Sequence, residues 1–379
     1  DRRQRQMCIR DSSYINKALD NGWLVSDSVV SPATTNAQED LQIRMTLEPV
    51  RDLKIDLNAG RTRNKSNQIQ FMYEGMPQIQ SGNFNMTVIT IGSAFERRSA
   101  SNGYSSSSFN RFLGNLDIIK NRIENMYAGV PYQGQSGLNQ QPLYQVNKYS
   151  SDVMIPAFLA AYTGRSASNS ALDLFPGILS MMPNWRVTYS GLSKLEFFKK
   201  YFKSVTLNHA YRSTYSVGSY STFQNFHSYM GDWGFVDDIQ TGIPVPSSMY
   251  DVSAVSINEQ FSPLLGVDVT FKNGITTKVE YKTTRILNLS LAANQIVESS
   301  TKDFVLGMGY KIMGLELFPG RNKKDSKNKI SNDLALRMDV SFRNQSALAR
   351  DIQQVTTQAT SGNTVSYTHL RAHETGAYL

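Results

Sequence analysis

The sequence is poor in cysteine, in charge and in long apolar runs. Cys8 is the single cysteine among 379 residues, which excludes a disulfide within the chain. Charged residues make up 18%, below the roughly 25% of an average soluble domain. No stretch of about 18 apolar residues occurs, which excludes a transmembrane helix. The basic residues behind the net charge of +8 are scattered along the chain, and we therefore expect no nucleic-acid partner.

Uncharged polar and aromatic residues take the place of the missing charge. Tyr and Phe number 19 and 18, a balance that suits a protein of the cell envelope. Apolar and polar residues alternate in five segments: 40–48, 52–60, 184–191, 303–312 and 333–342. A period of two predicts β-strands, each with one apolar face and one polar face.

The clearest hairpin is predicted around Asn273 and Gly274. A three-residue loop, 272–274, pairs Phe271 with Ile275 and Val269 with Thr277, and it places the apolar positions of both arms on one face. Register follows the buried or apolar face, so we predict this loop with Gly274 in the left-handed conformation. The second arm alternates as far as residue 291, which corresponds to a length of roughly 55 Å at about 3.3 Å per residue. This arm is much longer than the strands of soluble domains, which average about 5–6 residues.

Two helices are predicted to interrupt the strands. Residues 109–127 carry apolar side chains at helical spacing and predict an amphipathic helix of about five turns. Residues 152–163 predict a buried helix with Asp152 as its N-cap and Gly164 as its stop. Segments rich in Ser, Asn and Gly elsewhere in the sequence predict loops. We interpret the basic loop 320–329 as a solvated connection.

Long alternating strands fit either a soluble β-sandwich or the wall of a membrane barrel. Strand length, uncharged polar faces and the aromatics Trp185, Tyr189, Tyr211 and Tyr215 favour the barrel, whose strands carry aromatic girdles. Arg285 contradicts this, because it falls on the apolar face, where it would cost about 2–4 kcal/mol at mid-bilayer. We expect that the strand leaves the membrane before Arg285 or that a bulge near 283–284 exchanges the two faces.

The tail holds the most enzyme-like pattern, His369 and His373 with Glu374 beside the second. A helix would place both rings on one face, but the zincin motif has its Glu between the histidines, where it acts as base. His209 and His227 are remote in sequence and offer no third ligand. We therefore predict no metal, cofactor or catalytic residues, and we expect that the protein is not an enzyme.

The two ends differ in character from the rest of the chain. Residues 7–12 (MCIRDS) and 366–375 (SYTHLRAHET) resemble translated sequencing-adapter text, and the alternation fails after residue 365. We interpret 1–12 and 366–379 as non-native, adapter-derived ends. Residues 13–365 are then the body of the protein, a β-barrel wall segment with helical insertions near 109–127 and 152–163.

Several stretches closely resemble one family in the same order along the chain. They are DVMIPAFLAAYTG, PNWRVTYSGLSKL, YFKSVTLNHAYRSTYSVGSY, INEQFSPLLGVDVTFKNGITTKVEYKTTR and QIVESSTKDFVLGMGYKI. They resemble the carboxy-terminal part of the SprA (Sov) family, the outer-membrane translocons of the type IX secretion system, which are linked to gliding motility. The resemblance covers roughly residues 13–365. The present chain is only a fraction of the length of that family.

The resemblance implies an all-β fold, a partial wall of a very large antiparallel transmembrane β-barrel with one or two inserted helices. It implies export of folded cargo proteins bearing carboxy-terminal signal domains through the cell outer membrane. The implied partners are this cargo, a lipoprotein-shuttle barrel, a periplasmic plug protein and outer-membrane lipid.

Alternation assigns the two faces of such a wall. The apolar face would contact lipid, and Lys278, Glu280, Lys282, Arg337 and Asp339 would line a hydrated lumen that does not grip a passing protein. Two other classes share the alternation. These are another outer-membrane β-barrel, porin-like or for lipopolysaccharide transport, and a secreted β-rich adhesin.

Overall fold

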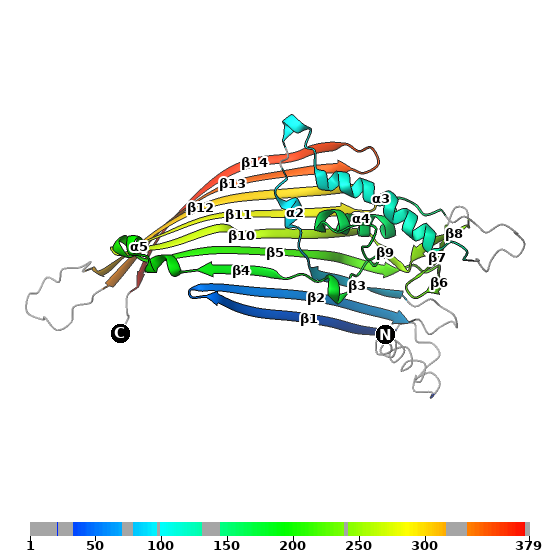
Figure 1. Ribbon diagram of the computed structural model, residues 1–379, viewed down its shortest axis with the longest axis horizontal. Helices are drawn as coiled ribbons and strands as arrows, with labels where there is room; N and C mark the ends of the chain where they lie inside the picture. Colours follow the sequence, from blue (N-terminus) through cyan, green and yellow to red (C-terminus); the bar gives the residue numbers. More distant parts are fainter. Residues whose placement is uncertain are drawn as a thin grey trace, which may run out of the picture.

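The computed structural model describes residues 21, 33–69, 79–96, 99–130, 145–238, 242–315 and 332–375. The N-terminal stretch 1–12 and the basic loop 320–329 lie outside these residues. The described chain is mainly β, and its largest element is an antiparallel sheet of 11 strands (Figure 1). The strands of this sheet are β1 (Ala33–Val50), β2 (Leu53–Ile69), β3 (Ile79–Thr87), β4 (Asn184–Tyr189), β5 (Phe202–Thr222), β9 (Tyr250–Val252), β10 (Ala254–Phe271), β11 (Ile275–Ser290), β12 (Gln295–Leu315), β13 (Asn332–Asp351) and β14 (Thr357–Thr375).

Strands β3 and β4 share one position in the sheet, between β2 and β5. Both pair antiparallel with β2 and with β5, so they run in the same direction, one after the other. The chain leaves the sheet after Thr87 and returns to it at Asn184, and we call residues 88–183 the helical insert. Its helical elements are α2 (Ile91–Ala94), η1 (Ala100–Asn102), α3 (Ser107–Met126), α4 (Ser151–Thr163) and η2 (Ile178–Ser180).

The remaining elements lie at the two ends of the long strands. A three-stranded sheet of β6 (Phe226–Met230), β7 (Trp233–Asp237) and β8 (Pro244–Ser248) separates β5 from β9, at the insert end of the sheet (Figure 1). The opposite end, which holds the turn between β10 and β11, carries η3 (Gly191–Lys194) and α5 (Glu196–Tyr201). We call this the hairpin end.

The predicted hairpin is confirmed. Val269 pairs with Thr277 and Val267 with Val279, the register expected from a loop of residues 272–274. Gly274 has a φ of +87°, and its backbone N–H donates to the carbonyl oxygen of Phe271 at 3.1 Å. An L side chain is strained at such a φ, so glycine is the residue that closes this turn without cost. The second arm is as long as expected, with β11 spanning 16 residues.

Both predicted helices are present, but the predicted cap of the second is wrong. α4 begins one residue earlier than expected with Ser150 at the N-cap, and it ends at Gly164 in the left-handed conformation, as predicted. Asp152 lies inside the first turn, where it is buried. Its Oδ2 accepts hydrogen bonds from the Ser247 hydroxyl at 3.0 Å and the Ser248 backbone N–H at 2.9 Å. Asp152 therefore ties α4 to β8, and burial raises the pKa of its carboxyl group.

A β-strand continues through residues 366–375, where we expected the β pattern to fail. β14 pairs with β13 as far as Thr375, including residues 366–375. Its side chains are out of phase with the sheet, because the apolar Val365 and Tyr367 pair with Arg343 and Ser341 and are exposed on the polar face. Backbone hydrogen bonds alone extend an edge strand in this way, since they do not depend on the side-chain pattern.

Candidate functional site: an apolar belt, a charged face and a buried ion cluster

One face of the sheet carries continuous apolar ladders near the hairpin end. Paired positions run Val267–Val279–Leu306–Val340 across four strands, with parallel ladders on either side. We call this surface the apolar belt. Its principal residues are Leu265, Val267, Val269, Ile275, Val279, Tyr281, Phe304, Leu306, Met308, Tyr310, Leu336, Met338, Val340 and Phe342. The same face continues across the sheet as Met45, Leu57 and Trp185, which are paired in one ladder on β1, β2 and β4.

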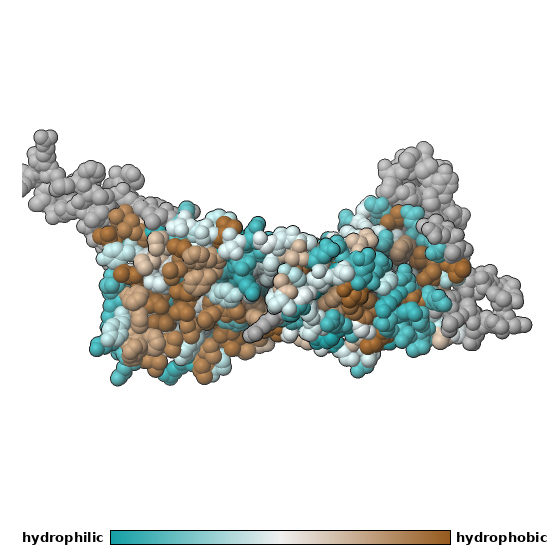
Figure 2. All heavy atoms as spheres, turned by 90° about the horizontal axis from the view of Figure 1, so that it is seen from above, coloured by the Kyte–Doolittle hydropathy of each residue, from teal (hydrophilic) through white to brown (hydrophobic). Residues whose placement is uncertain are grey.

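The described residues leave the belt uncovered. Phe304, Met308 and Phe342 are 41%, 47% and 51% exposed, values far above those of core residues. Figure 2 shows apolar side chains gathered over the half of the molecule away from the helical insert. From Phe304 to Ile312 the belt measures roughly 26 Å along β12, at about 3.3 Å per residue. A contiguous apolar surface of this extent marks a contact with membrane or protein.

The opposite face of the same strands is polar and carries charges of both signs. One ladder of this face contains Asp268, Lys278 and Asp339, with Gly307 between Lys278 and Asp339. A second ladder places Asp303 opposite Arg343, whose guanidinium Nε lies 2.7 Å from the Asp303 carboxylate. Neighbouring charges thus largely neutralise one another. We call this surface the charged face.

Lysines and a glutamate continue the charged face along β11. Lys278 and Lys282 both place Nζ 2.9 Å from the carboxylate of Glu280. Arg337 likewise contacts Asp339 at 2.8 Å. All five residues that we predicted for the polar side therefore lie on one face.

The helical insert covers the far half of the belt face. The same alternation that exposes Met308 buries Ile257, Leu287 and Leu289, each 0% exposed, beneath α3 and α4. Phe112 and Phe158, also fully buried, join the two helices with ring centroids 6.4 Å apart. One face of one set of strands therefore has an open half and a half that forms the core with the insert.

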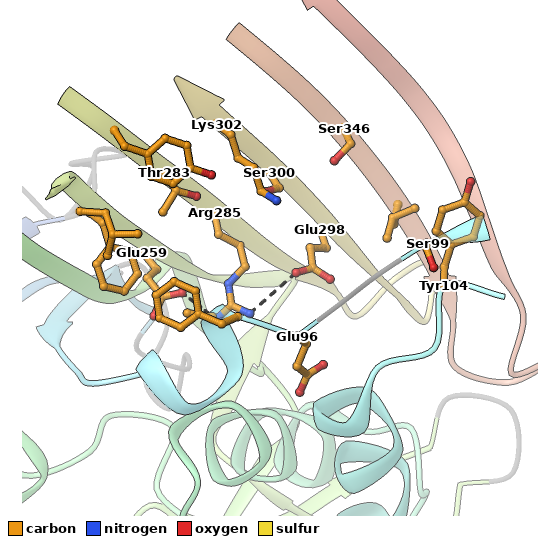
Figure 3. Close-up of a pocket in the computed structure, with 16 residues that line it drawn as sticks. Glu96, Ser99, Tyr104, Glu259, Thr283, Arg285, Glu298, Ser300, Lys302 and Ser346 are labelled. Atoms are coloured by element: carbon orange, nitrogen blue, oxygen red, sulfur yellow. Dashed lines mark ion pairs between the residues drawn. The ribbon is translucent and has the colours of Figure 1, made fainter. Parts of the chain in front are cut away.

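Four buried charges lie where the insert meets the sheet. They are Glu259, Arg285, Glu298 and Arg350, each 4% exposed or less. Arg285 lies 2.8 Å from Glu259 and 3.8 Å from Glu298, and Arg350 lies 3.6 Å from Glu298. Figure 3 shows Arg285 reaching from β11 towards both glutamates. We call these four residues the ion cluster, and their formal charges cancel.

The ion cluster fastens the insert to the sheet through hydrogen bonds. Arg285 donates to the carbonyl oxygen and the hydroxyl of Ser93 in α2, both at 2.7 Å. Glu259 accepts from the Thr90 hydroxyl at 2.6 Å, and Arg350 donates to the carbonyl oxygen of Tyr104 at 2.7 Å. Hydrogen bonds between charged and neutral groups in a buried setting are among the stronger ones. The segment 90–104 is therefore held on the sheet by charge.

The position of Arg285 corrects one expectation. β11 pairs with β12 from Ile275 to Ser290 without a register shift, so β11 has no bulge near 283–284. The irregularity lies in the neighbouring strand, between Phe261 and Leu265 of β10. Arg285 stays on the apolar face because the insert covers it there and supplies its partners. Sequence reasoning missed Glu259, Glu298 and Arg350, although each interrupts the apolar alternation of its strand as Arg285 does.

A cavity of about 550 Å³ opens beside the ion cluster, between the loop after α2 and the sheet. Phe95, Phe261 and Tyr281 line it, together with Ser300 and Lys302 of β12 (Figure 3). No histidine or cysteine lines it. The cavity marks the border between the open half and the covered half of the face.

Glu96 links the segment after α2 to the N-terminus of α3 within the insert. Its carboxylate accepts hydrogen bonds from the Ser106 and Ser107 hydroxyls at 2.6 and 2.7 Å and from the Ser108 backbone N–H at 2.9 Å, at the N-terminus of α3. Partial burial opposes ionisation, but these hydrogen bonds outweigh it and lower the pKa of Glu96 to about 2. The ionised carboxylate therefore acts as an added cap of α3.

The histidines that suggested a metal site are not brought together. His369 and His373 lie in the edge strand β14 rather than on a helix. His209 contacts the Leu264 carbonyl oxygen through Nδ1 at 2.6 Å, and His227 contacts Asp237 at 3.2 Å. Among the described residues, no group of three or more His, Cys, Asp or Glu side chains could hold a metal ion.

No family model matches the chain, and no curated protein matches it. In the described part of the chain, no helix is long and apolar enough to cross a membrane.

Proposed function

We propose that this chain is a segment of the wall of an outer-membrane β-barrel that conducts folded proteins, of the type IX translocon kind. One observation carries the proposal: strands of 16 to 21 residues present an uncovered apolar belt on one face and paired charges on the other. A belt about 25 Å tall, made by alternation on antiparallel strands, is what a transmembrane barrel shows to lipid. From Phe304 to Ile312 the belt covers nine residues of β12, and a tilted transmembrane β-strand needs about 9–11.

The charged face suits the lining of a protein-conducting pore. Its acidic and basic groups pair at 2.7–2.9 Å, so it presents neither a strong field of one sign nor an apolar surface. A folded protein passing such a hydrated lining finds no patch on which to adhere. This role requires no nucleophile, metal or cofactor, and the energy for transport would come from elsewhere. Cargo type and secretion route rest on the resemblance to the SprA (Sov) family.

A soluble sandwich is the alternative that the geometry favours less. A sandwich covers its apolar face with a second sheet, whereas the described elements cover only the half of that face beneath the insert. The insert ends at the ion cluster and the cavity, where the belt's aromatic residues Tyr281, Phe304 and Phe342 form a ladder. Aromatic residues at the edge of an apolar band are typical of a membrane boundary.

Substitutions on the two faces test the proposal. Leu336→Arg and Val279→Arg place a charge on the belt and are expected to cost about 2–4 kcal/mol each if lipid covers these positions. Lys278→Gln, on the charged face, is the control and should be mild, because the Lys278 side chain is 43% exposed and Glu280 keeps Lys282 at 2.9 Å. The measurement is the fraction of the complete protein that assembles into the outer membrane and resists extraction by urea. Equal tolerance of both kinds of change would contradict the assignment of the faces.

Deletion of the gene separates a translocon from the other classes. Loss of secreted proteins that bear carboxy-terminal signal domains supports the translocon. Small-solute conductance of the complete protein with normal secretion would instead indicate a porin-like barrel. Release from membranes by salt or urea would indicate a secreted adhesin.

A further inference from the structure

The short helix α5 exposes aromatic side chains beside unpaired lysines at the hairpin end of the sheet (Figure 1). Leu195, Phe197 and Tyr201 are 54%, 70% and 52% exposed. Lys199 and Lys200 are also exposed, and within the described residues neither forms an ion pair. This combination of exposed rings and exposed ammonium groups is unusual for a surface that contacts only water.

α5 is joined rigidly to the end of the apolar belt. Phe198 packs against Phe202 with ring centroids 5.9 Å apart, and Phe202 packs against Phe271 at 5.0 Å. The backbone N–H of Lys272, in the β10–β11 turn, donates to the carbonyl oxygen of Tyr201 at 3.3 Å. The next ladder contains Ile275, which begins the belt. The apolar surface of the belt thus passes through the Phe271 pair onto α5.

A second contact fixes the segment that precedes α5. Lys194, at the end of η3, lies 2.6 Å from the carboxylate of Asp52 in the turn between β1 and β2. The segment is therefore held at both ends, by the β1–β2 turn and by the β10–β11 turn. The outward direction of Phe197 and Tyr201 is a property of this framework rather than of a loose loop.

The charges of the segment favour an anionic neighbour. Lys199, Lys200, Lys203 and Lys272 stand against one acidic residue, Glu196, in the helix and its immediate surroundings. Lys200 places Nζ over the Tyr201 ring, 5.5 Å from its centre, so an ammonium group and an exposed ring lie side by side on α5. Lysines and aromatic rings together suit a boundary between an apolar layer and a polar one.

We propose that α5 is an interfacial anchor, whose exposed rings enter the acyl boundary of the lipid bilayer and whose lysines bind the phosphate groups of lipid heads. The inference rests on the proposed membrane function and deepens it by locating one edge of the bilayer. Continuity with the belt favours lipid over a second protein as the occupant, because the same lipid that covers Met308 would meet Phe197 next. Short segments rich in Lys and aromatic residues bind membrane surfaces by these two contacts.

Spin labels at single cysteines test the anchor in the complete protein, reconstituted in nanodiscs of phosphatidylethanolamine and phosphatidylglycerol. In a cysteine-free background the label replaces Phe197, Met308 or Tyr229. Tyr229 lies on β6 at the insert end and is 54% exposed, so it serves as the water-exposed control. Each label is scored for collision with oxygen, which partitions into lipid, and with a water-soluble nickel chelate.

The expected result is that the Phe197 label collides with oxygen more than the Tyr229 label does and with the nickel chelate several-fold less. The Met308 label should lie deeper than either. The pair Lys199→Gln and Lys200→Gln should raise nickel accessibility at Phe197 several-fold, whereas the pair Lys120→Gln and Lys148→Gln in the insert should leave it unchanged.

Each contrary result has a distinct meaning. If the Met308 label lies in lipid but the Phe197 label is as accessible to the nickel chelate as the Tyr229 label, the anchor is overturned and the proposed function stands. A Phe197 label shielded from both reagents shows that protein covers α5, which also overturns it. An unchanged Phe197 label after loss of both lysines overturns phosphate binding. A Met308 label in water refutes the membrane function and the anchor with it.

Discussion

Replacement of Arg285 by methionine should detach the helical insert from the sheet without unfolding the belt strands. The side chain is 4% exposed and lies between Glu259 and Glu298, at 2.8 and 3.8 Å. Methionine keeps the length of the side chain but leaves the Glu259 carboxylate buried without its cation. Removal of one partner of a buried ion pair costs about 3–5 kcal/mol. The two hydrogen bonds to Ser93 are lost at the same time.

The assay is native-state hydrogen exchange of the complete protein, followed by mass spectrometry. The free energy of opening for peptides of α2, α3 and α4 should fall by about 3–5 kcal/mol, while peptides of β12 and β13 near the hairpin end keep theirs. Arg343→Met is the matched control. Arg343 forms an exposed ion pair with Asp303 at 2.7 Å, and such pairs contribute about 0.2–1 kcal/mol.

A second substitution sharpens the test. Glu259→Gln added to Arg285→Met removes the stranded charge but keeps an oxygen that can accept from Thr90 and Tyr211. Glu298 retains Arg350 at 3.6 Å. The double variant should therefore recover part of the lost opening free energy. If Arg285→Met costs no more than Arg343→Met, the ion cluster does not hold the insert and the reasoning is refuted.

Two further variants probe the insert and the sheet. Glu96 has a folded-state pKa of about 2, below its ordinary value of about 4.3. Its stabilisation of the insert is thus fully present above about pH 4.3 and is lost as pH falls towards 2. In Glu96→Gln, the urea midpoint of the insert should lose that part of its acid sensitivity, and an unchanged acid profile would exclude Glu96 as its source. Gly82→Ala would drive Cβ into the Asn64 carbonyl oxygen and should cost about 1–3 kcal/mol of unfolding free energy. Gly92→Ala, which meets no atom within 4 Å, should be near neutral in the same urea titration, and equal midpoints for the two variants would contradict the predicted clash.

Local patterns in the sequence were sufficient for strands β1, β2, β4 and β10 to β13, the hairpin and the two main helices. The alternation in residues 303–312 and 333–342 predicted β12 and β13, and the face rule predicted the register around Gly274. These features depend on neighbouring residues along the chain or across one tight turn. The N-cap of α4 was wrong because Asp152 bonds to Ser247 and Ser248, which lie far away in sequence. No local signal distinguishes such a residue from a cap.

The interruption of one strand position by the helical insert could not be predicted. β3 ends at Thr87 and its continuation β4 begins at Asn184, so the two halves look like separate strands in the sequence. In the sequence, the charges of the ion cluster appear only as exceptions to alternation. Their role in holding the insert could not be predicted, because their partners Ser93 and Tyr104 approach them only in the folded chain.

Alternation along the chain predicts that the strands have two faces, one apolar and one charged, because a period of two is a local property of the extended chain. The turn at Gly274 is predictable for a similar reason, because glycine adopts a positive φ without strain. Which half of the apolar face is core and which half is open depends on the folded chain. The insert covers Leu287 and leaves Met308 uncovered, although both positions show the same alternation. Burial is a property of what packs against a residue, and the packing partners here come from residues 88–183.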